Sequence, residues 1–517
     1  MELNNKPPYS PDSAPKLGLV TNSIKEFDDA GKEHSEKNIR ALFEALKNEG
    51  SISKDSIYYG KRIFGYHEAG VVAEEFAKAT VDVILIFNSA FPNGYVFPLI
   101  AMNPYLQKIP IIIAADEEPN LSIGSYEWAT NSVCGNDMNN YVAKYIGRYA
   151  RFLDGSPQSA ELQKELKILL NAYHTVKCLR HDYLGRFGDA PGGFHSASGD
   201  QLLFFKTFGT TVNTVDLLRV REVYDSMETE GILGRRNFSE EDILKTQDEM
   251  SRGRLNLLSD QKMLYQGARL YHVLRAIIKA EGFTSAAFKC WPEIMGGSFS
   301  MSPCFSISWA LSKGDVTAFA CESDWPGAVI QSMGTLLSGK PAAFLDFVNW
   351  SRDSDILQLG HCGIGIPGTM EPEDPALLDR AKKEGQPPEK LKSQVLAGEV
   401  AVTDAVIEHG VSREAGTNLG PSVIGQFQYG VKTGIDMVQT PDGGLKMLVF
   451  TGESSPDTAR KILYSGSDLH VSNYQRLFQL KREHGFSHHL ALAIGDIARE
   501  LKELCAYYGI EYITPDR

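Results

Sequence analysis

Short apolar runs alternate with longer amphipathic stretches early in the chain, and this alternation constrains the fold more than any other feature. Three apolar runs lead the series: Leu17–Thr21, Val81–Asn88 and Pro110–Asp116. Between them lie two segments whose apolar residues have helical spacing, Ser35–Asn48 and Glu68–Ala79. Strands that alternate with helices build a parallel sheet covered by helices. The sequence therefore predicts an α/β domain in this part of the chain.

The length of 517 residues suggests about three domains, since one domain typically holds about 100 to 200 residues. A second series of strands begins near Tyr183, and a later one includes Gly430–Gln439 and Leu445–Thr451. A last helix is predicted over Leu490–Tyr508. We predict two doubly wound α/β domains followed by a β-rich, barrel-like C-terminal domain, with the boundaries 1–155, 156–340 and 341–517.

Composition and charge argue against several classes of protein. The chain has 52 basic and 65 acidic residues and a net charge of −13, which disfavours binding to nucleic acids or anionic membranes. Its apolar runs are far shorter than the roughly 20 residues that cross a bilayer, and Met1–Lys16 lacks the apolar stretch of a secretory signal. Seven scattered cysteines without a C-x-x-C pair are typical of reduced thiols. We expect a cytoplasmic protein that binds a small molecule.

Three apolar runs in the middle of the chain each end in a side chain that can bind a metal ion. The terminal residues are Glu322, Asp346 and His361. Any one of them could instead cap a helix or form a salt bridge. If the runs are neighbouring strands of one sheet, however, their ends lie within about 5 Å of each other. Two carboxylates at that range repel unless a cation lies between them, and this ligand type suits Mn²⁺, Mg²⁺ or Co²⁺.

The pair His488–His489 precedes the predicted C-terminal helix. Histidines at the start of a helix could supply one further metal ligand and one group that binds substrate or carries a proton. The alternative is a capping Ser487 followed by two partly exposed histidines without a functional role. Asp324 and Glu293 are reserve ligands for the predicted metal site.

Four segments together resemble the superfamily of L-fucose isomerases and L-arabinose isomerases, which interconvert aldoses and ketoses. The segments are Lys289–Glu293, Ala320–Gly327, Phe344–Asp346 and Gly360–Gly363. The resemblance implies that two residues, Glu322 and Asp346, hold Mn²⁺ (or Mg²⁺ or Co²⁺) and act as the catalytic acid and base. It further implies that His489 is the third ligand, that His361 is the fourth and that His488 contacts the substrate.

The resemblance extends over nearly the whole chain, because Gly185–Asp189 also looks like the second domain of these isomerases. It implies two α/β domains followed by a barrel-like domain. It also implies a homo-oligomer, often a hexamer, whose active sites lie at subunit contacts. A neighbouring N-terminal domain would then contribute the loop that begins at Asn88.

The substrate is the least constrained feature, because the glycine-rich segment Gly188–Ala197 departs from the usual arabinose isomerase sequence. Its Pro-Gly-Gly turn, with Arg186, His195 or Lys206 nearby, could hold a phosphate or sulfonate, or could simply reverse the chain. We expect a fucose-type or arabinose-type sugar, or a 6-substituted sugar such as sulfoquinovose, which would yield sulfofructose. The predicted substrate contacts are His488, Asn88, Arg186, His195 and Trp291.

An aldose–ketose isomerase moves a proton between C1 and C2 of the sugar through an enediol. A divalent ion stabilises the charge that develops on the two oxygens, and two carboxylates can act as base and acid. A non-catalytic sugar sensor and a metal-dependent hydrolase are competing interpretations. A sensor has no need for two carboxylates and a histidine around a cation, and the resemblance favours the isomerase over the hydrolase.

Overall fold

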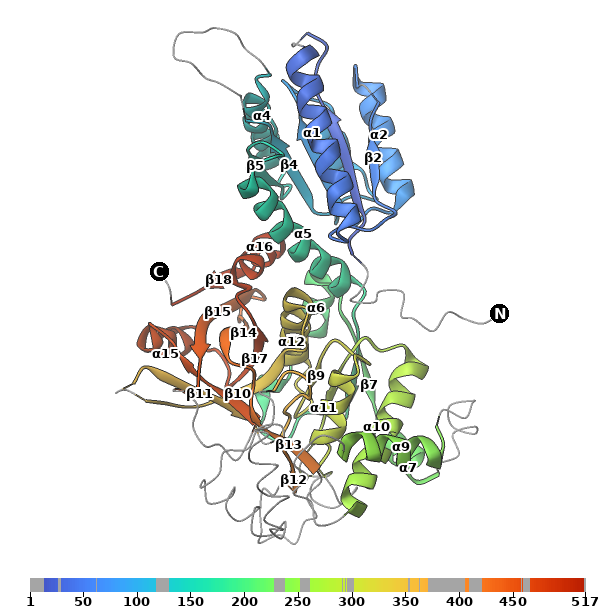
Figure 1. Cartoon of the computed structure of the whole chain (residues 1–517), viewed down its shortest axis with the longest axis vertical. Helices are drawn as coiled ribbons and strands as arrows, with labels where there is room; N and C mark the ends of the chain where they lie inside the picture. Colours follow the sequence, from blue (N-terminus) through green and yellow to red (C-terminus); the bar gives the residue numbers. More distant parts are fainter. Residues whose placement is uncertain are drawn as a thin grey trace, which may run out of the picture. The chain divides into compact units, whose positions relative to one another are not determined.

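The computed structural model divides into two compact units, residues 8–178 and residues 179–517. It describes residues 14–26, 29–61, 63–117, 130–226, 238–251, 261–290, 292, 294, 302–351, 354–361, 363–370, 405–408, 421–456, 458 and 465–515. Each unit has its own sheet system, drawn in Figure 1. The three predicted domain boundaries remain a prediction.

The N-terminal unit is built on a five-stranded parallel sheet in the order β2-β1-β3-β4-β5. Its strands are β1 (Leu17–Asn22), β2 (Ile57–Tyr59), β3 (Val83–Asn88), β4 (Ile111–Ala115) and β5 (Arg151–Asp154). Every residue of β1, β3 and β4 is buried, because helices cover both faces of such a sheet. The strand order reverses between β1 and β3, as in doubly wound folds, which confirms the predicted fold class.

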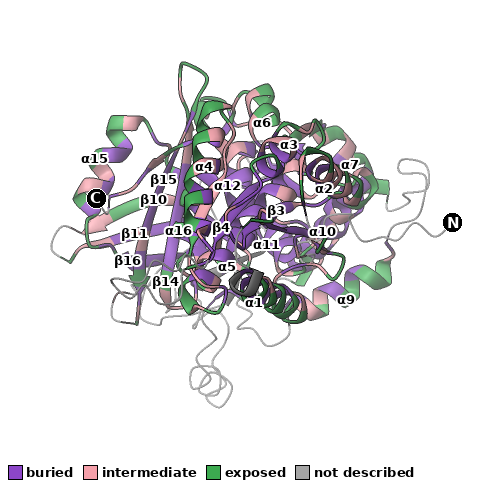
Figure 2. Cartoon of the chain, turned by 90° about the horizontal axis from the view of Figure 1, so that it is seen from above, coloured by how far each residue is buried: buried purple, intermediate pink, exposed green. Residues whose placement is uncertain are grey.

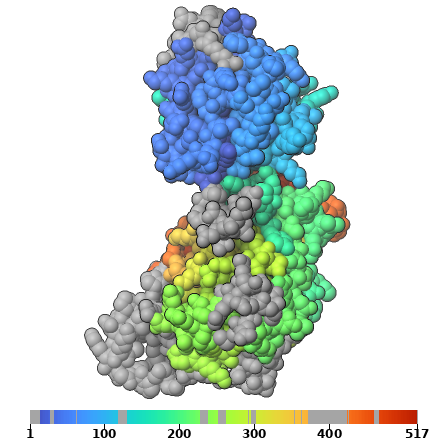
Figure 3. Space-filling model, turned by 90° about the vertical axis from the view of Figure 1, so that its right-hand side faces the viewer, coloured from blue at the N-terminus to red at the C-terminus, as the bar shows by residue number. Residues whose placement is uncertain are grey.

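In the described part of this unit, five helices enclose the sheet: α1 (Asp29–Asn48), α2 (Tyr66–Ala79), α3 (Val96–Met102), α4 (Ser132–Tyr145) and α5 (Ala160–Arg180). Figure 2 shows α1 and α5 on the opposite side of the strands from α2, α3 and α4. On the latter side, Phe76 and Phe97 pack against strand residues such as Ile86. Figure 3 shows one face of this unit in space-filling form, and its early segments, drawn in blue, form much of that face.

The second unit begins with a four-stranded parallel sheet in the order β7-β6-β8-β9. Its strands are β6 (Tyr183–Phe187), β7 (Thr211–Val215), β8 (Ser285–Phe288) and β9 (Phe319–Ala320). The helical elements of this region are η1 (His195–Ala197), α6 (Gln201–Thr207), α7 (Leu217–Ser226), α9 (Glu240–Ser251), α10 (Gln261–Glu281), α11 (Cys304–Ser312) and α12 (Trp325–Ser338). This sheet is the second α/β layer that the sequence predicts.

The chain continues into a nine-stranded sheet, part of which closes into an antiparallel barrel. Around the barrel the order is β16-β11-β10-β17-β14-β15, and the Glu453–His470 pairing joins β15 back to β16. The sheet's strands are β10 (Ala343–Ser351), β11 (Ile356–His361), β12 (Ala405–Glu408), β13 (Pro421–Gln426), β14 (Gly430–Gln439), β15 (Leu445–Ser454), β16 (Ser465–His470), β17 (His489–Ile494) and β18 (Glu511–Ile513). Its helices are α15 (Tyr474–His484) and α16 (Ala498–Tyr508). The predicted barrel-like C-terminal domain is thus confirmed.

The prediction of one helix over Leu490–Tyr508 is wrong in its first part. His489–Ile494 forms β17, which pairs with β10 and β14 in the middle of the sheet, and the helix begins only at Ala498. A strand in that place is almost entirely buried, so nearly every position is apolar. A short apolar run of this kind has no period that separates a strand from a helix.

Helix α12 lies between the parallel sheet and the barrel and connects them. The side-chain amide of Gln331 accepts a hydrogen bond from the Phe319 backbone N–H of β9 at 2.9 Å, and it donates one to the Ala342 carbonyl at 2.9 Å. Further along, Gly334 brings the helix so close to the barrel that an added Cβ would lie 2.9 Å from Ala342. These contacts fix the middle of α12 between the two sheets.

None of the helices in the described part of the chain has the length and apolar character needed to cross a membrane.

Candidate active site

Side chains from both sheets of the second unit converge near the N-terminal end of α12. In the barrel, β10 lies between β11 and β17, so that Asp346 is paired with Gly360 on one side and with His489 on the other. His361 directly follows Gly360, and Glu322 follows β9 of the parallel sheet. The structure thus brings together the four residues that were predicted as metal ligands.

Two overlapping groups of side chains have the geometry to hold one ion. The ligand atoms of Glu322, His361 and His489 all lie within 4.8 Å of one another, and so do those of Asp346, His488 and His489. His488, predicted to contact substrate, is therefore adjacent to the metal candidates. Its ring centroid lies 4.0 Å from that of His489.

The assumption that Glu322, Asp346 and His361 end neighbouring strands of one sheet is wrong. Only Asp346 and His361 lie on adjacent strands, whereas Glu322 comes from the parallel sheet. Asp346 also lies inside β10, which continues to Ser351. The convergence arises because α12 holds the end of the parallel sheet against the barrel, an arrangement that residue patterns along one strand cannot reveal.

A strained turn between β9 and α12 directs Glu322. Glu322 and Ser323 have φ angles of 57° and 56°, in the left-handed region that costs a non-glycine residue roughly 1 to 3 kcal/mol. Ser323 stabilises the turn, because its N–H donates to the Phe288 carbonyl at 3.0 Å and its hydroxyl donates to the Gly188 carbonyl at 2.8 Å. Both acceptors belong to the end of the parallel sheet, so the sheet itself fixes the Glu322 backbone.

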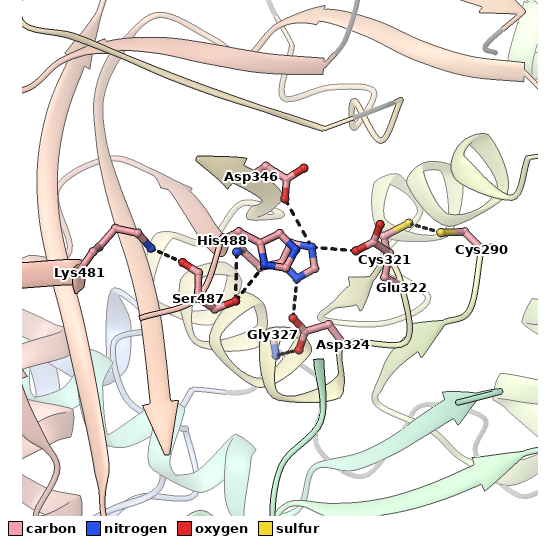
Figure 4. A network of polar contacts seen from close by, with 10 residues as sticks. Cys290, Cys321, Glu322, Asp324, Gly327, Asp346, Lys481, Ser487 and His488 are labelled. Carbon is pink, nitrogen blue, oxygen red and sulfur yellow. Dashed lines mark hydrogen bonds and ion pairs between the residues drawn. The ribbon is translucent and has the colours of Figure 1, made fainter. Parts of the chain in front are cut away.

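His489 is the centre of the cluster. Figure 4 shows the carboxylates of Glu322, Asp324 and Asp346 converging beside His488. Nε2 of His489 lies 3.0 Å from Oε2 of Glu322 and 3.5 Å from Oδ1 of Asp346. Its Nδ1 lies 2.7 Å from Oδ2 of Asp324. The imidazole is almost completely buried, and the ring of Phe344 lies 4.6 Å away, centroid to centroid. The ring orientation is therefore fixed from three sides.

Asp324 uses both carboxylate oxygens within the protein. Oδ1 accepts a hydrogen bond from the Gly327 N–H at 2.7 Å and thereby caps α12, while Oδ2 accepts one from Nδ1 of His489. The sequence marks the first role, since Asp followed by Trp-Pro is a helix-start pattern. It does not mark the second, because His489 lies 165 residues further along the chain. Asp324, a reserve ligand in the prediction, contacts the nitrogen of His489 that faces away from Glu322.

The electrostatics of the cluster favour a bound cation. Burial lowers the pKa of His489, but hydrogen bonds to Asp324 and Glu322 raise it more, to about 10. Burial raises the pKa of Asp346 to about 6, and it lowers that of His488. The buried Oδ1 of Asp346 accepts no hydrogen bond from any described residue. Two carboxylates and two imidazoles, with an unsatisfied oxygen among them, are a donor set that fits a divalent metal.

The glycine-rich segment after β6 lies beside the cluster. The ring of Phe194 contacts that of His488 edge-on, with centroids 5.7 Å apart. Arg186 is largely buried and donates from Nη2 to the hydroxyl of Ser198 at 3.1 Å and to Asp189. His195 starts η1 and is exposed. The structure thus brings this segment to His488, while the sugar-binding roles of Arg186 and His195 remain predictions.

Two other predicted substrate contacts, Asn88 and Trp291, remain predictions. Asn88 belongs to the N-terminal unit, is fully buried, and donates to Oδ1 of Asn136 at 2.9 Å while accepting from Asn22 at 3.5 Å. Its amide ties the ends of β1 and β3 to α4. Trp291, together with the reserve ligand Glu293, lies outside the described residues.

Several known proteins are similar in sequence to most of this chain. A protein named sulfoquinovose isomerase from Alkalicoccus urumqiensis is 25% identical over 436 residues, which cover 84% of this chain and 86% of that protein. Proteins of the same name from Priestia aryabhattai and Priestia megaterium are 22% identical over 436 residues, or 83% of this chain and 85% of theirs. No protein-family model matches the chain. The chain is therefore similar, along most of its length, to isomerase enzymes.

Proposed function

We propose that this protein is a divalent-metal-dependent aldose–ketose isomerase that converts sulfoquinovose to sulfofructose. The observation that carries the proposal is the convergence of Glu322, Asp346 and His489 on one point. The similarity to sulfoquinovose isomerases supports the choice of substrate. Two carboxylates beside a histidine can supply the base and the acid of an enediol reaction.

Glu322, Asp346 and His489 would hold the metal, with His361 as a fourth ligand. When bound, a divalent cation polarises the sugar carbonyl and offsets the negative charge of the enediolate. The two ligand groups found among the described residues offer oxygen and nitrogen atoms and no thiolate. Such ligands suit Mn²⁺, Mg²⁺ or Co²⁺.

The two carboxylates move the protons of the reaction. One carboxylate removes the proton from C2 of the aldose and returns it to C1, while the other transfers a proton between O1 and O2. Burial raises the pKa of Asp346 to about 6, which brings this group close to the pH at which proton exchange is most efficient. The turn at Glu322 and Ser323 holds the second carboxylate on the parallel-sheet side of the site.

His488 is placed to bind a sugar hydroxyl. It is exposed, and its Nδ1 lies 3.3 Å from the hydroxyl of Ser487. Burial of part of the ring lowers its pKa, so the imidazole is neutral at pH 7 and has both a donor and an acceptor nitrogen. A neutral imidazole beside the metal candidates orients a substrate without adding charge.

The proposal is tested by ¹H NMR of the protein with added Mn²⁺, exchanged for Mg²⁺ or Co²⁺ in parallel samples, in D₂O. With sulfoquinovose we expect sulfofructose to appear and the C2 proton of the remaining sulfoquinovose to be replaced by deuterium. L-fucose, L-arabinose and D-arabinose serve as neutral comparison sugars. Turnover of a neutral sugar with none of sulfoquinovose would overturn the substrate, and silence on all sugars with metal bound would overturn the isomerase.

A His489→Ala variant is expected to bind Mn²⁺ at least about tenfold more weakly, because the variant loses a ligand that Asp324 and Phe344 hold in place. Isothermal titration of the protein with Mn²⁺ measures the dissociation constant directly, without turnover. His470→Ala is the matched control, since His470 is exposed at the end of β16. Equal dissociation constants for His489→Ala and wild type would remove His489 from the ligand set.

A further inference from the structure

A polar pocket lies in the N-terminal unit, at the carboxyl ends of β1 and β2. Three of its lining residues are lysines, and two others have hydroxyl groups. The polar lining comprises Thr21, Ser23, Lys25, Lys32, Glu36 and Lys61. Among the described lining residues, three are lysines and one is a glutamate, so this part of the lining has a positive charge although the whole chain has a net charge of −13.

The position of the pocket in the sheet is one where ligands bind. In open α/β sheets, ligands bind outside the carboxyl ends of the strands, near the point where the strand order reverses. Here the order reverses between β1 and β3. Asn22, at the end of β1, is bound to the loop between β3 and α3. Its Oδ1 accepts a hydrogen bond from the Asn93 N–H at 3.0 Å, and its Nδ2 donates one to the Asn93 carbonyl at 3.2 Å. Asn22 lies between the lining residues Thr21 and Ser23, so these bonds hold the backbone of this part of the lining.

Lys32 is the residue that points to a ligand. The residue is only 4% exposed and lines the pocket, and its ammonium has no hydrogen-bond or ion-pair partner among the described residues. Glu36, one turn later in α1, accepts instead from the hydroxyl of Ser89 at 3.3 Å. Because so little of the Lys32 side chain reaches water, its charge is only partly solvated, which carries a cost. An anion in the pocket would remove this cost.

We propose that this pocket binds an oxyanion, namely a sulfonate, sulfate or phosphate group. Lys32 supplies a charge on a largely buried side chain, Lys25 and Lys61 supply charge at the rim, and the hydroxyls of Thr21 and Ser23 supply neutral donors. The source of the oxyanion is either the sulfonate of the sugar or a free inorganic anion. The assignment of the pocket to the sulfonate of the sugar rests on the proposed function. The affinity of the pocket for an oxyanion does not depend on that function.

Isothermal titration of the full-length protein with sodium sulfate, sodium phosphate and sodium methanesulfonate, at constant ionic strength in chloride, tests the proposal. We expect at least one of the three anions to bind, and Lys32→Gln to weaken that binding about tenfold or more. Lys37→Gln is the matched control, because Lys37 is an exposed lysine of the same helix. Lys61→Gln provides a second variant at the rim, where Lys61 is 76% exposed and its loss leaves the core intact. Absence of binding by all three anions, or equal affinity in wild type and both pocket variants, would overturn the proposal.

Kinetics then separate the two sources. If the sulfonate of the sugar occupies the pocket, Lys32→Gln raises the KM for sulfoquinovose and sulfate competes with the sugar. If a free anion occupies it, the same variant loses sulfate binding with an unchanged KM. Both results support the oxyanion site. Because anion titration needs no turnover, a failure of the isomerase proposal leaves the titration interpretable.

Discussion

Replacement of Glu322 by glutamine is expected to lower turnover by about 10²-fold or more while the fold stays intact. The glutamine side chain has the same shape, but it can neither take up a proton nor balance the charge of a cation. The turn that directs residue 322 is stabilised by hydrogen bonds from Ser323 to Phe288 and Gly188. Since those bonds involve no atom of the Glu322 side chain, the substitution leaves the backbone unchanged.

The measurement is the initial rate of ketose formation by NMR, at a Mn²⁺ concentration well above the dissociation constant of the variant. Thermal unfolding of wild type and variant checks that the fold is retained. Glu161→Gln is the control, since Glu161 is exposed in the first turn of α5. Turnover near the wild-type level would remove Glu322 from proton transfer. Recovery of full turnover at high Mn²⁺ alone would restrict Glu322 to holding the metal.

The sequence predicts the layers of this fold well, because burial on both faces leaves a direct trace in composition. The strands β1, β3 and β4 are completely buried and appear as uninterrupted apolar runs bounded by polar residues. The ligand candidates Glu322, Asp346 and His361 are found for a related reason. Each ends an apolar run, and a charged or ionisable side chain at that place needs a partner.

The sequence does not predict contacts that depend on the packing of one sheet against another. His489 was expected at a helix start, yet it begins β17, since an apolar run as short as Leu490–Ile494 is compatible with either structure. The joining of Glu322 and Asp346 from two sheets follows from the placement of α12. The pocket around Lys32 combines residues of three segments, each of which looks like ordinary surface sequence.

Replacement of Asp324 by asparagine is expected to reduce Mn²⁺ affinity at least tenfold and turnover by about 10²-fold or more, although residue 324 makes no direct contact with the proposed metal. A carboxylate only accepts hydrogen bonds, so Nδ1 of His489 must carry a proton, and a cation that displaces the second proton can bind at Nε2. Asparagine has one oxygen for two donors. If that oxygen keeps the Gly327 N–H, the amide NH₂ faces Nδ1 and moves the imidazole proton to Nε2, the atom that lies between Glu322 and Asp346.

Asp324→Ser separates the two roles of the carboxylate, because serine caps a helix well but is too short to reach His489. In that variant His489 loses the hydrogen bond from its Nδ1 to residue 324. Its Nε2 can still be unprotonated and bind the cation. We therefore expect Mn²⁺ affinity to fall in the order wild type, serine, asparagine, with a similar unfolding temperature for serine and wild type. If asparagine instead turns its oxygen to His489, its NH₂ opposes the Gly327 N–H and the helix cap is lost, at a cost of about 1 kcal/mol in the free energy of unfolding. If the Asp324→Asn variant keeps the helix cap and binds Mn²⁺ with higher affinity than the Asp324→Ser variant, the carboxylate does not set the tautomer of His489.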